Sequence, residues 1–143
     1  MNVPMTLGNT TQLVFCRENV NPDVVSEMLG LVPSEAVKVG EAAEHLNGAW
    51  YTSHLGIWKL DLPNAGTDQT VETQIGLWVE LLRPKSVELS QLRGMGYCPY
   101  LDCKADAGSL SICVEPELLV SLGQLNVSLS VWLYEQPQVR TAA

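Results

Sequence analysis

The stretch Val20-Asn21-Pro22-Asp23-Val24-Val25-Ser26-Glu27-Met28-Leu29-Gly30 contains both ends of a short helix. Proline in the first helical turn loses no hydrogen bond, and the Asn21 side chain can cap the N–H groups behind it. The acidic Asp23 faces the positive end of the helix dipole. Gly30 suits the left-handed position after the last turn. The stretch therefore predicts a helix from Pro22 to Leu29, after an apolar strand over residues 12–16.

A shorter copy of this pattern returns near the end of the chain, as Val114-Glu115-Pro116-Glu117-Leu118-Leu119-Val120-Ser121-Leu122-Gly123. It predicts a second helix over residues 116–122 that ends at Gly123. The two copies are compatible with a duplication. They are equally compatible with repeated use of the same capping rules, so both explanations stay open.

Between the copies the chain alternates strand and helix patterns. Gly56-Ile57-Trp58-Lys59-Leu60-Asp61-Leu62 predicts a strand whose buried face carries Trp58, Leu60 and Leu62. A long helix follows, because apolar residues recur there at helical spacing. These residues are Val71, Ile75, Trp78, Val79 and Leu82.

Pro84 is expected to break this helix and to start a separate helical segment that ends at Gly94. In that segment we expect Glu88, Gln91 and Arg93 to face solvent. The segment over residues 38–51 has no clear pattern and is expected to be irregular.

The last third of the chain is predicted to be mainly strand. Residues 97–105 and 109–114 form a hairpin in this interpretation, with a turn at 106–108 flanked by the carboxylates Asp102 and Asp106. In the closing strand, residues 127–134, one set of side chains faces the core. This set is Val127, Leu129, Val131 and Leu133.

This order of elements favours an α+β fold, an antiparallel or mixed sheet with helices on one face, in a ferredoxin-like arrangement of two halves. No linker, charge run or low-complexity tract interrupts the 143 residues. We therefore expect a single domain over residues 1–143 with an ordered core at about 12–135.

The composition and net charge of the chain argue against some classes of binding partner. Hydrophobic residues make up 46% of the chain, and 8 basic against 16 acidic residues give a net charge of −8. That charge argues against nucleic acid and anionic membranes, which need clustered Lys and Arg. No apolar run approaches the roughly 20 residues of a membrane span, and no signal peptide is visible. We therefore expect a cytoplasmic protein.

The four cysteines, Cys16, Cys98, Cys103 and Cys113, lack the spacing of a metal site. Reduced thiols with a structural role are the expectation. Cys16, Cys103 and Cys113 fall within predicted strands, where free cysteine behaves as a small hydrophobic residue.

Three motifs occur in a fixed order: Asn21-Pro22 with Leu29-Gly30-Leu31 and Pro33-Ser34, then Gly56-Ile57-Trp58, then Leu81-Leu82 with Pro84-Lys85. With Gly96-Tyr97, the helix opening at Pro116 and the closing strand, this ensemble resembles a bacterial family known only as domain of unknown function 4279. The resemblance covers the chain from about Leu13 to Tyr134. It implies a compact bacterial α+β domain and brings no catalytic residues to assign.

Acid–base or metal chemistry has one candidate location. Glu44, His45 and His54 bracket a segment with Trp50, and they could line a pocket roofed by that indole. An exposed loop that happens to hold both histidines is the alternative. The chain has no nucleophile elbow and no phosphate loop. We therefore assign no catalytic residue, no metal and no cofactor.

The aromatic residues give the other candidates. Trp58 and Trp78 fit core positions, whereas Trp50 and Tyr51 lie in the irregular segment. Trp132 and Tyr134 share the closing strand's face opposite its core stripe. Aromatic residues on a polar strand face are typical of interfaces, and covering by the middle helix is the competing explanation.

Three hypotheses follow. The first is a small acidic binding protein that engages a protein partner through the 38–51 segment and nearby strand faces, for example as an inhibitor or immunity protein of a basic toxin. The second is a small-molecule-binding module or enzyme that uses the His45 and His54 loop. The third is self-association, in which the strand of Trp132 and Tyr134 extends a sheet across a symmetric dimer.

Overall fold

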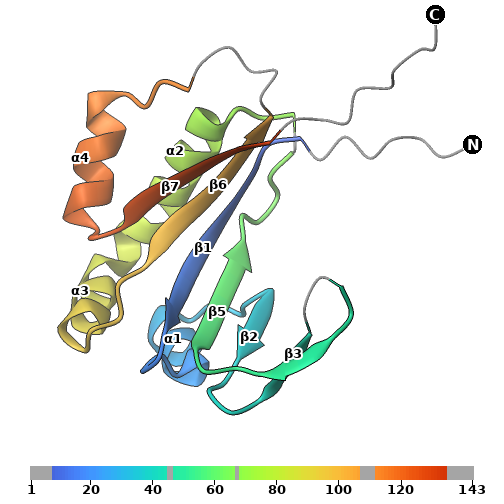
Figure 1. Ribbon diagram of the computed structural model, residues 1–143. Helices are drawn as coiled ribbons and strands as arrows, with labels where there is room; N and C mark the ends of the chain where they lie inside the picture. Colours follow the sequence, from blue (N-terminus) through green and yellow to red (C-terminus); the bar gives the residue numbers. More distant parts are fainter. Residues whose placement is uncertain (1–7, 45–46, 67, 107–111, 135–143) are drawn as a thin grey trace, which may run out of the picture.

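A computed structural model describes residues 8–44, 47–66, 68–106 and 112–134. The fold is α+β, with a mixed five-stranded sheet whose helices lie on one face (Figure 1). The strands are β1 (Thr10–Arg17), β2 (Glu35–Val37), β3 (Ala42–Glu44), β4 (Trp50–Thr52), β5 (Gly56–Asp61), β6 (Tyr100–Asp106) and β7 (Ser128–Tyr134). The helices are α1 (Pro22–Leu29), α2 (Val71–Leu82), the short 3-10 helix η1 (Arg83–Lys85), α3 (Ser86–Gly94) and α4 (Pro116–Gln124).

The sheet has the strand order β2-β5-β1-β6-β7. The central strand β1 runs antiparallel to β5 and β6, and β2 runs antiparallel to β5. The last strand, β7, is parallel to β6, so the sheet is mixed. The elements β1, α1, β2, β5, α2 and β6 follow a β-α-β-β-α-β order, and outside it lie the β3–β4 pair, η1, α3, α4 and β7. The ferredoxin-like comparison of two halves therefore stays a prediction.

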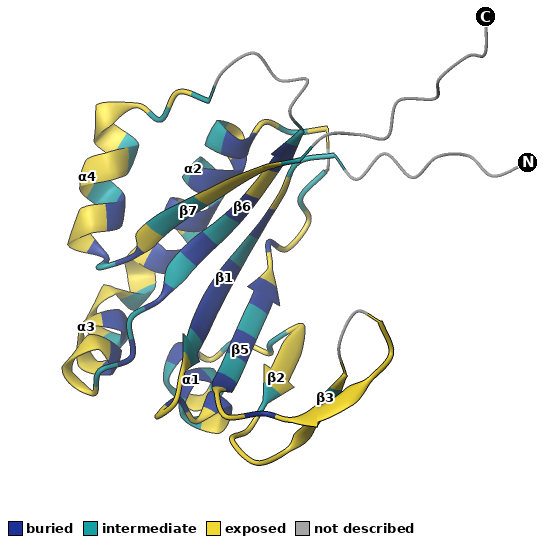
Figure 2. Ribbon diagram, viewed as in Figure 1, coloured by how far each residue is buried: buried dark blue, intermediate teal, exposed yellow. Residues whose placement is uncertain are grey.

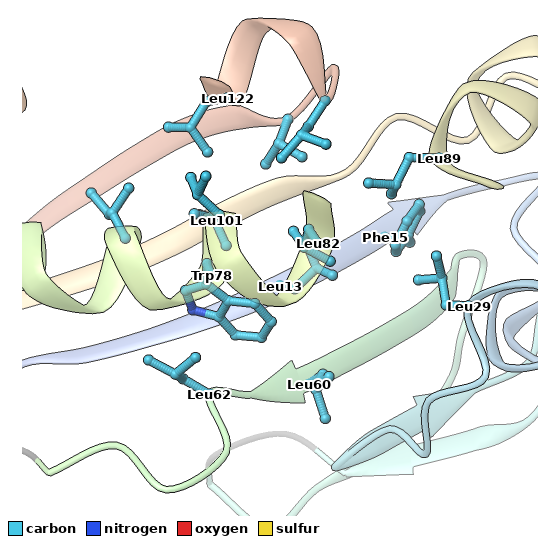
Figure 3. Close-up of a cluster of buried hydrophobic side chains, with 14 of the residues drawn as sticks. Leu13, Phe15, Leu29, Leu60, Leu62, Trp78, Leu82, Leu89, Leu101 and Leu122 are labelled. Atoms are coloured by element: carbon cyan, nitrogen blue, oxygen red, sulfur yellow. The ribbon is translucent and has the colours of Figure 1, made fainter. Parts of the chain in front are cut away.

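One face of the sheet carries the hydrophobic core (Figure 3). Leu13, Phe15 and Trp58 are fully buried there, as the alternation in the sequence predicts. Phe15 and Trp58 meet edge to face with ring centroids 5.6 Å apart, a geometry that contributes about 1 kcal/mol beyond burial. The predicted helical stripe of α2 is also buried, including Trp78.

The first helix confirms the capping prediction. The Asn21 side chain accepts a hydrogen bond from the Asp23 N–H, and Gly30 closes α1 with a φ of 65°. The Trp58 Nε1–H donates to Ser26 Oγ at 2.9 Å, which ties α1 to β5. The break at Pro84 is confirmed as well, because η1 separates α2 from α3.

The second copy of the pattern ends differently from the prediction. Helix α4 continues through Gly123 to Gln124, and Asn126 takes the left-handed conformation with a φ of 59°. Asparagine tolerates this conformation because its short polar side chain bonds locally. The ending at Gly123 was therefore wrong.

The predicted hairpin over residues 97–114 is also wrong in the described part. β6 pairs with β1 and β7, and Ile112 and Val114 are not in a strand but pack against the core. Cys113 is exposed, and its N–H donates to the Glu72 carboxylate. The predicted turn at 106–108 lies mostly outside the described residues.

Two further corrections concern local structure. The 38–51 segment includes an antiparallel pair, β3 with β4, instead of an irregular loop. Glu88 is half-buried, with Oε2 out of contact with water and without a hydrogen-bond partner among the described residues, so it does not face solvent as predicted. Gln91 and Arg93 are exposed as expected.

Candidate functional site

The second face of the sheet is polar on β6. Leu101, Cys103 and Ala105 of this strand point into the core. Tyr100, Asp102 and Lys104 alternate with them and therefore point to the opposite face. No described helix packs over these three side chains, and we refer to this surface as the open face (Figure 1).

The β6–β7 register adds a second row of side chains to the open face. Ser128 lies beside Tyr100, Ser130 beside Asp102 and Trp132 beside Lys104. Neighbouring strands lie about 4.8 Å apart, so each pair is in contact range. Two of the three β7 side chains are serines. The row of side chains next to the sheet edge therefore extends only a short distance above the strand backbone.

A concavity of about 710 Å³ forms where the serines leave space. Its lining includes Cys16, Tyr100, Asp102, Ser130 and Trp132. The basic side chains of Lys104 and Arg17 line it as well. It therefore combines an aromatic wall, hydroxyl groups and charges of both signs on one strand-lined surface.

Asp102 is the unusual group in this lining. Its Oδ1 is out of contact with water and has no hydrogen-bond partner among the described residues. A desolvated carboxylate oxygen without a donor costs free energy, and the cost is relieved when a donor arrives. Oδ1 itself is shielded, but the half-buried side chain also lines the concavity, so an external donor or cation can approach the carboxylate from that side.

Two neighbouring groups on the open face stay neutral at physiological pH. Burial raises the pKa of the Tyr100 hydroxyl, and nearby Cys16 and Asp102 raise it further. Burial also raises the pKa of the Cys16 thiol, against the opposing charge of Lys59. Neither group supplies the anionic nucleophile that covalent catalysis needs.

Among the described residues, the outer edge of β7 has unpaired backbone groups. The Ser128 N–H donates to the Pro99 carbonyl at 3.1 Å, so Ser128 directs its backbone toward β6. Backbone direction alternates along a strand with one neighbour. The N–H and C=O groups of Leu129, Val131 and Leu133 therefore point away from β6, and no described strand pairs with them.

Side chains at this edge are apolar and exposed. Val131 is 40% exposed, Trp132 62% and Leu133 65%. The prediction that one stripe of this strand faces the core holds for Val127 and for the half-buried Leu129, but it is wrong for the exposed Val131 and Leu133.

The two edges of the sheet differ in their protection. β2 has three residues, and its Glu35 forms an ion pair with Lys59 at 3.8 Å. β7 has seven residues and contains neither a charged residue nor proline. Natural edges are usually blunted by shortness, charge or proline, so β7 is an unprotected edge within the part of the chain that the structure describes.

The predicted aromatic pair lies on this strand. Trp132 projects from the open face, so covering by the middle helix, the competing explanation, is wrong for it. The Tyr134 hydroxyl donates to the Gly8 carbonyl, which fixes the end of β7 against the start of β1. Burial and Asp106 raise the pKa of Tyr134. Tyr134 therefore has a structural contact, whereas the side chain of Trp132 is mainly exposed.

The other predicted site residues lie on the β3–β4 hairpin, which projects from the sheet (Figure 2). Glu44 pairs with Trp50 in the β3–β4 register, and Trp50 is 70% exposed, so its indole is mostly open to solvent. Tyr51 and His54 are exposed nearby. His45 lies outside the described residues. The hairpin is inserted between β2 and β5, at the edge opposite β7, so the structure does not bring these residues to Trp132.

Sequence reasoning missed Asp102 and Ser130 as members of a site. Polar residues at 100, 102 and 104 alternate with apolar ones at 101, 103 and 105, which is the signal of a strand with one uncovered face. The interpretation of Asp102 and Asp106 as a pair of carboxylates flanking a hairpin turn concealed the place of Asp102 in this row of polar side chains.

The described part of the chain contains no group of three or more His, Cys, Asp or Glu side chains placed to hold a metal ion. Within the same residues, no helix has the length and apolar character needed to cross a membrane.

The fold and surface define an α+β sheet domain with one covered face, one open face and an unprotected edge. The chain belongs to the family described as a domain of unknown function, DUF4279, whose sequence model matches residues 8–136. Searches of curated proteins and of solved structures found no match.

Proposed function

We propose that this protein is a protein-binding domain that takes an extended segment of its partner as an additional strand along β7. The observation that carries this proposal is the outward row of backbone groups at Leu129, Val131 and Leu133 beside exposed apolar side chains. In β-augmentation, backbone hydrogen bonds supply affinity and alternate side chains supply specificity.

The partner that fits is a basic protein rather than a second copy of this chain. Each copy carries a net charge of −8, so two copies repel, whereas a basic partner is attracted and steered. β7 itself is uncharged, so a strand can approach it without displacing an ion pair. Inhibition of a basic protein, as by an immunity protein, is one role of this kind.

We place the protein in the reducing cytoplasm of a bacterial cell. All four cysteines are free thiols, which is the usual state in a reducing compartment. Buried Cys103 acts as a small core residue.

The test is selection of nine-residue peptides from a random display library on the wild-type protein. Selected peptides are then measured against Leu133→Pro, which removes one outward N–H and leaves the β6 bonds of Ser130 and Trp132 intact. Trp50→Ala is the matched control. It removes a large apolar side chain from the β3–β4 hairpin that is about as exposed as Leu133. Leu133→Lys is a second edge variant in which the backbone N–H stays.

We expect Leu133→Pro to weaken selected peptides at least tenfold and Leu133→Lys to weaken basic ones, while Trp50→Ala has no effect. Thermal unfolding confirms that each variant is folded. Peptides that lose binding only in Trp50→Ala would move the interface to the hairpin and overturn the proposal. A stable dimer in sedimentation, abolished by Leu133→Pro, would make a second copy the occupant and overturn it as well.

A further inference from the structure

We infer that the open face selects a partner strand with Lys or Arg at a position facing the concavity, and that Asp102 receives this cation across Ser130. This inference rests on the proposed function, because the strand must first lie along β7. It assigns a recognition role to the concavity.

The distances across the sheet set the length of the side chain. A strand added to β7 lies two strand spacings, roughly 10 Å, from β6. Short side chains cannot reach Asp102 over that distance, whereas the long stems of Lys and Arg can extend along apolar surface and present their charge at the far end. The length requirement therefore favours the two basic residues.

Ser130 leaves space for a partner side chain to extend from a strand added at β7 to Asp102, a path that we refer to as the route. It lies between Asp102 and the sheet edge in the register, and its small side chain forms part of the concavity floor. A larger residue at this position would fill the space that a partner side chain must cross. The concavity of about 710 Å³ is wide enough for a side chain of this size.

Asp102 supplies the charge at the end of the route. Its Oδ1 has no donor among the described residues, and no described cation lies within ion-pair distance of the carboxylate. Asp102 as a whole is half-buried and lines the concavity, so a guanidinium or ammonium group can reach the carboxylate there and form a charge-assisted hydrogen bond. Trp132 stands beside the route, and its exposed ring can hold a cation over its face.

Lys104 and Arg17 line the same concavity, so an acidic side chain is the competing ligand. Lys104 lies two residues after Asp102 on β6, beside Trp132. Arg17 is the last residue of β1 and lines the concavity away from Lys104. The net charge of −8 raises the cost of bringing an acidic segment to this surface. We therefore commit to the basic strand and let the experiment separate the two.

The experiment uses labelled nine-residue peptides in which valine alternates with lysine, glutamine or glutamate, measured by fluorescence polarisation. Asp102→Asn removes the proposed acceptor. Asp61→Asn is the matched control, because it removes one negative charge from the same face on β5. Ser130→Leu closes the route without a change in charge.

We expect the lysine peptide to bind wild type at least tenfold more tightly than the glutamine peptide. Asp102→Asn and Ser130→Leu should remove that preference, and Asp61→Asn should retain it. Tighter binding of the glutamate peptide, or a lysine preference unchanged in Asp102→Asn, would overturn the inference.

Leu133→Pro separates this inference from the proposed function. If Leu133→Pro abolishes binding of every peptide while Asp102→Asn changes nothing, strand addition stands and the role of Asp102 fails. If binding of every peptide survives Leu133→Pro, the proposed function fails, and the inference fails with it.

Discussion

Ser130 lies directly beside Asp102 in the β6–β7 register, and Asp102 Oδ1 has no hydrogen-bond partner among the described residues. A hydroxyl thus lies next to a carboxylate oxygen that lacks a donor. The folded protein retains an unfavourable group on a surface that no described helix covers. Such a cost is typical of binding sites, where stability is lost in favour of recognition.

The first prediction concerns this cost. Asp102→Asn should raise the free energy of unfolding by about 0.5–1 kcal/mol, because a neutral amide is less costly to desolvate than a carboxylate. Urea denaturation at neutral pH measures the change. Asp61→Asn should not stabilise the protein, since Asp61 accepts a hydrogen bond from Gln12 Nε2 at 2.6 Å. A clear loss of stability in Asp102→Asn would show that the carboxylate is already satisfied.

A second prediction concerns a series of buried side-chain hydrogen bonds between β1 and α2. Trp78 Nε1–H donates to Thr11 Oγ1 at 2.8 Å, and that hydroxyl donates to Gln74 Oε1 at 2.8 Å. Thr11→Val should cost about 2–4 kcal/mol, because it leaves a donor and an acceptor buried without partners. Thr11→Ser retains the hydroxyl and should cost less. Equal losses in both variants, measured by thermal unfolding, would contradict the role of the hydroxyl.

A third prediction explains the glycine in Gly56-Ile57-Trp58. A Cβ atom at position 56 would lie 1.7 Å from the Val20 carbonyl oxygen, which belongs to the backbone. Gly56→Ala should therefore cost at least about 3 kcal/mol, since overpacking against backbone cannot relax easily. Gly76→Ala is the matched control: its Cβ would meet no atom within 4 Å in α2, so the variant should gain up to about 1 kcal/mol. Similar effects at both positions in urea denaturation would contradict the close approach.

A fourth prediction concerns alkaline pH. Burial, with a contribution from Asp102, raises the pKa of Cys103 from 9.0 to about 12. Between these values the unfolded thiol ionises and the folded one stays protonated, so stability is complete below pH 9 and falls as pH rises toward 12. The loss is about 1.4 kcal/mol per pH unit.

Cys103→Ala should remove this component of the decline, and Cys113→Ala at an exposed position should retain it. Urea denaturation at several pH values from about 8 to about 11, where the unfolded thiol ionises and the folded thiol stays protonated, measures the slopes. Identical slopes in wild type and Cys103→Ala would contradict the assignment.

Local rules predicted much of the fold. Capping of α1, the alternation around Trp58 and the stripe of α2 are properties of short segments, and the structure confirms all three. Strand pairing is a long-range property, and this is where prediction was wrong. The turn pattern after residues 97–105 predicts a hairpin neighbour for them, whereas the sheet has β1 and β7 beside β6.

The candidate site was predicted only in part for the same reason. Trp132 stood out because an indole on a polar strand face is unusual. Asp102 is recognisable as part of a site only once Ser130 is known to lie beside it. That pairing joins two strands that α4 separates in the sequence, so the sequence does not indicate it. The exposure of Leu133 also depends on whether a helix packs over it. The periodicity of the strand gives the face on which a residue lies, but it cannot indicate what covers that face.

Amide hydrogen exchange along β7 tests the central claim most directly. In the free protein, the N–H groups of Val131 and Leu133 should exchange quickly, while those of Ser130 and Trp132, bonded to β6, should be protected. Addition of the valine–lysine peptide should protect Val131 and Leu133 and leave the β3–β4 hairpin unchanged. Protection of Val131 and Leu133 before any peptide is added, or protection confined to the hairpin on binding, would contradict the account.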